Sequence, residues 1–326
     1  MIPRISENAN RCETIDADNM HNLLKKYSRH ETNFYNLLKN RPVPHFPTAH
    51  IYYIEEVCGA ETDAESGGMV AEDLVGQVHA IDFLPGLNEA QVLALMEALA
   101  GLHWITLRDL ERESDFADFP EQSIFTDRLQ VAMYDEAVLL EQICPEKFGN
   151  SRIQNLAWSF DYDYKTAQIQ KLVQKLGRKI LVHGDLNVSN ILWRNAAPNE
   201  IAAIIDYQFV HVGSIAADIV RVLTLGVSRA HRKEHTDRYL KYYWQKLDEL
   251  TKSDKMSNVL SFNELKEQYW ETFAISSNFT LFGIGLYHKM YSDGSLGKAE
   301  KRAENLRELL DRAEGIVEDI ENLARK

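Results

Sequence analysis

The segment from Lys179 to Asp206 constrains the fold more than any other part of the chain. It holds three short apolar runs, Ile180–Val182, Ile191–Trp193 and Ile201–Ile205, separated by polar loops. Apolar runs of this length, bounded by turn residues, are typical of buried strands. We expect them to form a small buried sheet in the middle of the chain.

Helical periodicity dominates the remainder of the sequence. Asn88 and Gln91 have the spacing of a capping pair, ahead of a long core helix that ends near Leu107. Further helices are expected at 20–39, 127–142, 216–226, 230–250, 262–290 and 297–324. Two strands are expected at His50–Glu55 and Met69–Glu72. The segment from Asp109 to Gln154 shows no clear pattern apart from the helix at 127–142. The sequence therefore predicts an α+β fold that is rich in helix at its carboxyl end.

Length and charge narrow the classes of partner. The 326 residues are enough for one large domain or two lobes. Lys and Arg total 36 against 49 Asp and Glu, a formal net charge of −13. The average surface would repel a phosphate backbone, so we expect no nucleic acid partner. The acidity identifies no substrate, because net charge also serves solubility.

Three cysteines, Cys12, Cys58 and Cys144, lie far apart in the chain. Their odd number and spacing fit neither a disulfide framework nor a paired-cysteine zinc site. The first ten residues are polar, unlike a signal peptide. No stretch comes near the ~18 apolar residues that a membrane span requires. We expect a cytoplasmic protein without a membrane span; the sequence does not indicate its oligomeric state.

The polar residues of the central segment form a two-part motif. Residues 181 to 193 read Leu-Val-His-Gly-Asp-Leu-Asn-Val-Ser-Asn-Ile-Leu-Trp, and Ile205-Asp206-Tyr207-Gln208 follows after the next strand. In kinase catalytic loops an Asp accepts the proton of the substrate hydroxyl, and an Asn five positions later binds magnesium. A second Asp after the next strand holds magnesium against the nucleotide phosphates. Asp185, Asn190 and Asp206 match these roles, so ATP and Mg²⁺ are expected.

This motif resembles that of the aminoglycoside-phosphotransferase and choline-kinase superfamily, and looks closest to its invertebrate choline-kinase-like group. The resemblance implies a protein-kinase-like fold with two lobes, a small amino-terminal lobe that is incomplete (1–75) and a large, mostly helical carboxyl-terminal lobe (76–326). It implies an ATP- and magnesium-dependent phosphotransferase that acts on a hydroxyl of a small molecule. Choline, ethanolamine, a sugar of the aminoglycoside kind and a steroid alcohol remain open as acceptors.

The resemblance also extends to residues outside the motif. Glu72, Asp73 and Leu74 match the hinge whose backbone receives adenine. Glu31 matches the helix residue that pairs with the nucleotide-binding lysine. His183 and Asp218 match residues that support the catalytic loop, Asp218 through backbone hydrogen bonds.

One part of the family pattern is missing. A kinase of this kind carries a glycine-rich turn and a strand lysine ahead of the position of Glu31. The first glycine here is Gly59, and the first lysine, Lys25, falls on the same predicted helix as Glu31. We therefore expect a chain that lacks its first strands. The alternative to an active kinase is a non-catalytic pseudokinase that acts as a binding or scaffold protein.

Three further patterns have simpler explanations. His231 and His235 have the spacing of a helical zinc motif, but they lie in a charged run that reads as a solvated helix face. Gly283-Ile284-Gly285 begins like a dinucleotide fingerprint, but no strand precedes it. The aromatic residues Trp158, Trp193, Trp270, Phe273, Phe279 and Tyr287 could line a pocket for a cationic acceptor, although core packing is the more common role of such side chains.

Overall fold

The computed structural model describes residues 17–39, 41, 43–58, 66–110, 113–120, 127–256, 259–297 and 299–325. The segment ahead of residue 17, where the missing turn and lysine were expected, lies outside these residues. The main helices are α1 (Ala17–Leu38), α2 (Glu89–Asp109), α3 (Asp127–Ile143), α6 (Tyr162–Leu176), α7 (Ala217–Leu225), α8 (Arg229–Ser253), α9 (Phe262–Asp293) and α10 (Arg302–Ala324). Short helical pieces α4 (Pro145–Phe148) and α5 (Ala157–Phe160) connect α3 to α6.

Within the described residues the strands are short and form three small sheets. β1 (Ile51–Cys58) pairs antiparallel with β2 (Ser66–Ala71). β5 (Ile191–Arg194) lies between β3 (Val78–Ala80) and β6 (Ala197–Ile204) in an antiparallel sheet. β4 (Leu181–Val182) pairs with β7 (His211–Val212). The expectation of one sheet from three apolar runs was therefore wrong, since β4 joins a strand that the sequence did not indicate.

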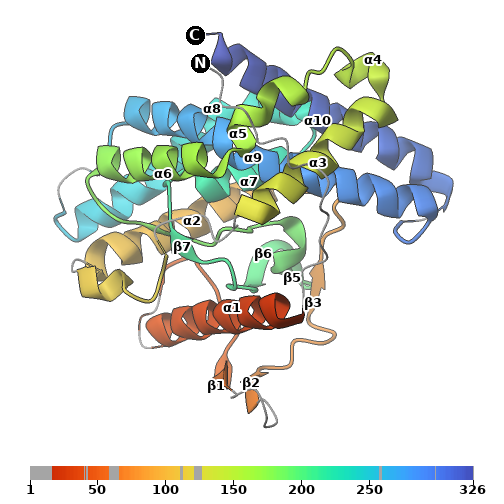
Figure 1. Cartoon of the computed structure of the whole chain (residues 1–326). Helices are drawn as coiled ribbons and strands as arrows, with labels where there is room; N and C mark the ends of the chain where they lie inside the picture. Colours follow the sequence, from red (N-terminus) through yellow and green to blue (C-terminus); the bar gives the residue numbers. More distant parts are fainter. Residues whose placement is uncertain are drawn as a thin grey trace.

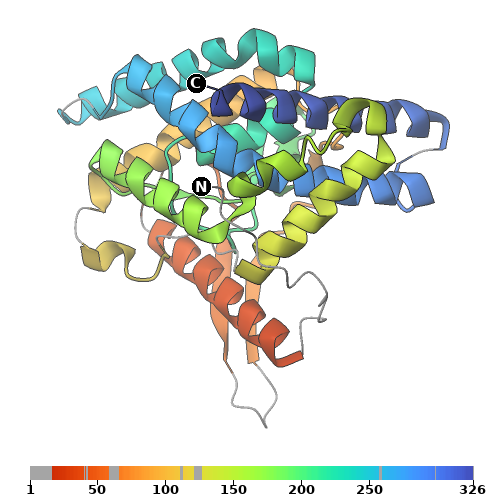
Figure 2. The ribbon, with the colours of Figure 1, turned by 45° about the horizontal axis from the view of Figure 1, so that its top comes forward.

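The elements separate into a small sheet end and a large helical end. Figure 1 shows β1 and β2 beyond α1 at one end, and the helices from α3 to α10 gathered at the other. α9 packs against α3, α7 and α10, and Figure 2 shows it running between α3 and α10. The loop that follows β4, residues 183–190, is bonded to the first turn of α7 through Asp218.

Helix α2 is largely buried and packs against α8. Asn88 and Gln91 make the predicted capping box at its start. Among the described residues, α2 is the one helix long and apolar enough to cross a membrane by length and composition, and 78% of its most apolar window is buried inside the molecule. The expectation that no stretch comes near that composition was wrong for α2. Burial on this scale is the property of a core helix.

A buried lysine lies among three helices of this core. Lys165 of α6 donates from Nζ to Gln130 Oε1 of α3 (3.0 Å) and to Asn278 Oδ1 of α9 (3.2 Å). Both partners are neutral, and burial lowers the pKa of Lys165 to about 7. The folded protein therefore releases this proton near pH 7, whereas the unfolded chain keeps it until its ordinary range near pH 10.

This difference predicts a pH-dependent stability. Between about pH 7 and pH 10 the unfolded chain binds more protons than the folded one, so Lys165 makes the unfolding free energy rise by up to ~1.4 kcal/mol per pH unit. A Lys165→Met variant is expected to lack this rise and to be more stable than the parent at pH 7. Urea unfolding of both proteins from pH 6.5 to 9.5 measures the difference. If the unfolding free energies of the two proteins changed with pH in parallel, the lowered pKa of Lys165 would be contradicted.

Candidate functional site

The catalytic loop begins with a glycine that no other residue can replace without a shift of the backbone. Gly184 follows β4 and has φ +85°, in the left-handed region. A Cβ at this position would lie 2.3 Å from the backbone oxygen of Phe209. The loop therefore turns sharply after His183 and brings the next residue, Asp185, out of the sheet.

Asp218, in the first turn of α7, holds the backbone of this loop. Its carboxylate accepts hydrogen bonds from the amide of His183 (2.7 Å) and the amide of Gly184 (3.0 Å). Burial raises the pKa of Asp218, while His183 and these two amide bonds act in the opposite direction. The buried His183 ring contacts the oxygen of Ile205 through Nε2 (3.0 Å), and its Nδ1 accepts from the amide of Asp185 (3.3 Å). These contacts join the loop to α7 and to the end of β6.

Both carboxylate oxygens of Asp185 have partners. Arg221 of α7 donates from Nε (3.0 Å) and Nη2 (2.8 Å) to Oδ1. Asn187 donates from Nδ2 to Oδ2 (3.1 Å). The side chains of Asp185 and Arg221 are 14% and 10% exposed. The ion pair is therefore well shielded from water and fixes the direction of the carboxylate.

Asn190 and Asp206 lie together at one end of the β5–β6 hairpin. Ile191 pairs with Ile204 in the register, and the amide of Ile205 donates to the oxygen of Asn190 (3.0 Å). Asn190 donates from Nδ2 to the backbone oxygen of Asp185 (3.0 Å), and its side chain lies near enough to the Asp206 carboxylate to lower the pKa of that group. The structure thus brings together the three residues expected to carry the chemistry.

Asp206 adopts a backbone conformation that costs free energy. Its φ is +69°, a value that few residues other than glycine adopt, although Asp and Asn tolerate it better than most. Burial raises the pKa of its carboxyl group, and the neighbouring Asp185 raises it further, while His183, Gln208 and Asn190 oppose the shift. A cation beside Asp206 would offset the cost of this buried charge.

The donor set fits a hard divalent cation. Asp206 supplies carboxylate oxygen, and Asn190 can supply its amide oxygen Oδ1, because its bond to the backbone oxygen of Asp185 uses Nδ2. In the described part of the chain no three His, Cys, Asp or Glu side chains gather into a metal cage. A magnesium ion here would therefore take most of its ligands from phosphate and water.

Glu31 of α1 faces this site. Its Oε1 accepts from the amide of Tyr207 (3.2 Å). Burial raises its pKa, and the Asp206 charge adds to the shift. No Lys or Arg among the described residues forms an ion pair with Glu31. Glu31 therefore lies beside the site, as expected. The lysine that would pair with it is absent from the described part of the chain.

The predicted hinge follows β2. The amide of Glu72 donates to the oxygen of His50 (2.9 Å), and Glu72 Oε1 accepts from the amide of His50 (2.8 Å). Asp73 caps the following turn by accepting from the amide of Val75 (2.9 Å). The amide of Leu74 makes no hydrogen bond within the described residues. The amide of Asp73 makes none there either, so of the three hinge residues Asp73 and Leu74 keep a backbone donor for a ligand.

Other features have structural roles. His231 bonds the Tyr239 hydroxyl through Nε2, and no third ligand approaches His231 and His235 in the described residues. Gly283 and Gly285 lie inside helix α9, which rules out a dinucleotide turn. Of the aromatic residues considered as pocket-lining candidates, some lie in the core and one contacts the site. Trp193 and Phe273 are fully buried, whereas Phe279 contacts Arg221.

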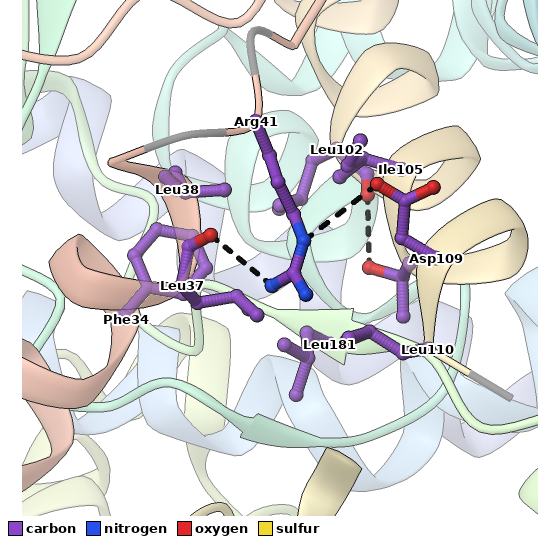
Figure 3. Close-up of a pocket in the computed structure, with 10 residues that line it drawn as sticks. Phe34, Leu37, Leu38, Arg41, Leu102, Ile105, Asp109, Leu110 and Leu181 are labelled. Atoms are coloured by element: carbon purple, nitrogen blue, oxygen red, sulfur yellow. Dashed lines mark hydrogen bonds and ion pairs between the residues drawn. The ribbon is translucent and has the colours of Figure 1, made fainter. Parts of the chain in front are cut away.

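A small cavity lies between α1, α2 and β4. Figure 3 shows Arg41 among its lining residues, with a hydrogen bond to the oxygen of Leu37 (3.2 Å) and an ion pair with Asp109 (3.7 Å). Its volume of about 10 Å³ has room for one water molecule. It cannot hold a nucleotide.

Arg221 is a residue of the site that was not predicted from the sequence. A signal was present, because Arg221 is the one basic residue in the apolar run Ile219–Leu225 of α7. A charge in such a run has to find a buried partner.

This geometry defines a kinase-like site, with the loop residues Asp185 and Asn190, the second acid Asp206, and Asp218 behind them. A family model described as "Uncharacterized oxidoreductase dhs-27" (DUF1679) matches residues 4–326, and the chain belongs to this family.

Two relatives from Caenorhabditis elegans support the assignment to different degrees. An "Uncharacterized kinase-like protein D1044.1" is 34% identical over 324 residues, which is 98% of this chain and 82% of the relative. The "Uncharacterized oxidoreductase dhs-27" is 25% identical over 232 residues, 69% of this chain but 27% of the relative. The match covers about a quarter of that second protein, so its oxidoreductase name is not transferred to this chain.

Solved structures of low identity are also similar. A GDP complex of aminoglycoside 2′-phosphotransferase-IIIa has 13% identity and a TM-score of 0.47, with 92% of this chain and 82% of that chain covered. The choline kinase LicA from Streptococcus pneumoniae has 12% identity and a TM-score of 0.42, with 90% and 80% covered. The kinase-like relative and the observed architecture confirm the predicted α+β, kinase-like fold.

Proposed function

We propose that the chain is an ATP- and magnesium-dependent phosphotransferase that acts on the hydroxyl of a small molecule. The observation that carries the proposal is the convergence of Asp185, Asn190 and Asp206 at the end of one hairpin, where Asn190 bonds the backbone of Asp185 and lies beside the Asp206 carboxylate. The solved kinases that this chain resembles include complexes with GDP and with ADP, which agrees with a nucleotide as co-substrate.

Each group has a chemical task in this proposal. The Leu74 amide would donate to adenine. Asp206 and Asn190 would hold magnesium, which supplies positive charge beside the phosphates. Asp185 would accept the proton of the acceptor hydroxyl. The acceptor oxygen then forms a bond to the γ-phosphorus as the bond from that phosphorus to the bridging oxygen breaks, and ADP leaves. Because the transition state is loose, the position of Asp185 matters more than its basicity.

Glu31 supports the alternative of a non-catalytic pseudokinase. A kinase pairs this residue with a lysine that orients the phosphates, and no such partner occurs among the described residues. A site without that lysine can bind nucleotide and still transfer phosphate slowly. The proposal therefore needs a test that measures nucleotide binding and transfer separately.

The test uses the 326-residue chain. Calorimetry with ADP, with and without Mg²⁺, measures binding, and γ-labelled ATP with a panel of small alcohols measures transfer. The proposal predicts binding that requires Mg²⁺ and a labelled product that requires both an alcohol and the metal. Magnesium-dependent binding without transfer would favour the pseudokinase. Absence of both would refute the kinase function.

A further inference from the structure

Arg221 places a positive charge directly beside the proposed acceptor position. Its guanidinium group bonds Asp185 Oδ1 through two nitrogens. Its Nη1 donates to Thr280 Oγ1 of α9 (3.2 Å). Its central carbon lies 4.1 Å from the centroid of the Phe279 ring. The guanidinium group therefore contacts both the carboxylate that would receive the acceptor proton and the ring of Phe279.

This arrangement opposes a cationic acceptor. An ammonium group that approaches Asp185 gains from a carboxylate and from an aromatic face, but Arg221 already occupies both. Its own charge repels a second cation at the short distances of such a site. Arg221 is 8% exposed, and its guanidinium group is bonded both to the loop at Asp185 and to α9 at Thr280, so it cannot easily turn away.

Helix α9 continues from this point as an apolar face. Phe279, Phe282, Leu286 and Met290 follow one another at helical spacing, so they lie on one side of the helix. The first two rings are stacked 6.2 Å apart, and Leu286 and Met290 are 40% and 39% exposed. Apolar side chains in a line from a reactive carboxylate offer a surface for the body of a substrate.

Gly283 lies on the same side of α9. A Cβ built at this position meets no atom within 4 Å, so there is open space above the helix between the aromatic rings and Leu286. A glycine inside a helix costs ~1 kcal/mol relative to alanine, and no close backbone approach requires it here. The space it leaves adjoins the apolar face.

We propose that this face of α9, defined by Phe279, Phe282, Gly283, Leu286 and Met290, is the acceptor subsite, and that the acceptor is an uncharged alcohol with an apolar body. The inference rests on the proposed function, since it places the hydroxyl at Asp185. Arg221 excludes a quaternary or primary ammonium group from the position next to Asp185. The apolar face then binds the hydrocarbon part of the acceptor.

Two ligands of the same shape, one charged and one neutral, test whether the site disfavours a cationic acceptor. Choline and 3,3-dimethylbutan-1-ol differ in one atom, a charged nitrogen in place of carbon. Calorimetry of each with the full chain in Mg²⁺ and ADP is expected to show tighter binding of the uncharged alcohol, by about 10-fold or more. A longer alcohol, 4-cyclohexylbutan-1-ol, should bind more tightly still, because it buries more apolar area. Equal or tighter binding of choline, or binding of none of the three, would overturn the inference.

Substitutions of Gly283 test whether the acceptor binds on this face of α9. Gly283→Leu fills the open space and is expected to weaken binding of 4-cyclohexylbutan-1-ol by about 10-fold or more. Gly283→Ala adds one methyl group to the same site, improves the helix and serves as the matched control, with binding close to that of the parent. Unchanged affinity in Gly283→Leu, with ADP binding and circular dichroism like those of the parent, would show that the face is not the subsite.

An Arg221 variant tests whether the preference for an uncharged acceptor depends on the Arg221 charge. Arg221→Met removes the charge but keeps an apolar contact with Phe279, so the preference for the uncharged alcohol over choline should narrow. If this variant does not fold, the ligand pair and Gly283→Leu decide the matter. If the uncharged alcohol binds in a Gly283-dependent manner but receives no phosphate, the subsite stands and the phosphotransferase function fails.

Discussion

An Asp185→Asn variant is expected to transfer phosphate about 10³-fold more slowly than the parent while it binds ADP and Mg²⁺ almost equally well. The amide has the shape of the carboxylate but cannot accept the proton of the acceptor. Its position next to Asn190 would be kept, because the backbone oxygen of Asp185 makes that contact. The loss should therefore fall on turnover and not on nucleotide affinity.

The measurement compares initial rates and ADP affinity in three proteins: the parent, Asp185→Asn and Asp135→Asn. Asp135 is an exposed residue of α3, so its variant controls for the chemical change itself. Arg221 loses a charged partner in Asp185→Asn, and the midpoint of thermal unfolding should fall by about 2–6 °C. Transfer that survives in Asp185→Asn at the rate of the parent would remove Asp185 from the proposed role.

An Asp206→Asn variant is expected to weaken magnesium-dependent nucleotide binding by about 100-fold or more, and to make the folded protein more stable at neutral pH. Nucleotide affinity falls because a neutral amide replaces the carboxylate ligand of the magnesium ion. Stability increases because the pKa of Asp206 is raised in the folded protein. Above that raised pKa the folded state holds a charge that burial disfavours, and below the ordinary Asp range the carboxyl group is neutral in both states.

The stability difference between Asp206→Asn and the parent should therefore be largest near pH 7 and disappear as the pH falls below the ordinary Asp range. Asn also tolerates the positive φ of this position. Thermal unfolding from pH 3.5 to 7.5, with calorimetry of ADP and Mg²⁺ at pH 7, measures both effects. A variant that loses stability at pH 7 would show that Asp206 is a structural residue.

The sequence predicted the long elements well and the short ones poorly. Helices such as α2 and α9 carry a clear period and capping residues, so their positions followed from local chemistry. β3 and β7 contain three and two residues, too few to show any period. Their existence depends on pairing with strands that lie far away in the chain, which no local pattern encodes.

Some residues of the candidate site could be predicted from the sequence and others could not, for the same reason. Asp185, Asn190 and Asp206 stand at fixed spacings around two apolar runs, and this spacing indicated that they would meet. The contact between Arg221 and Asp185 spans 36 positions and depends on how α7 packs. The occupied amide of Glu72 depends likewise on its pairing with His50. The roles of these residues in catalysis and nucleotide binding remain predictions, and so does the boundary between lobes near residue 75.

Asp218 and Arg221 are three residues apart on α7, so one helical turn carries both the anchor of the loop backbone and the partner of the Asp185 side chain. A displacement of α7 during thermal motion or evolutionary drift would carry the backbone and the carboxylate in the same direction and by similar amounts. The alignment of the reactive group would then survive small changes in the surrounding core, because its two points of attachment cannot separate.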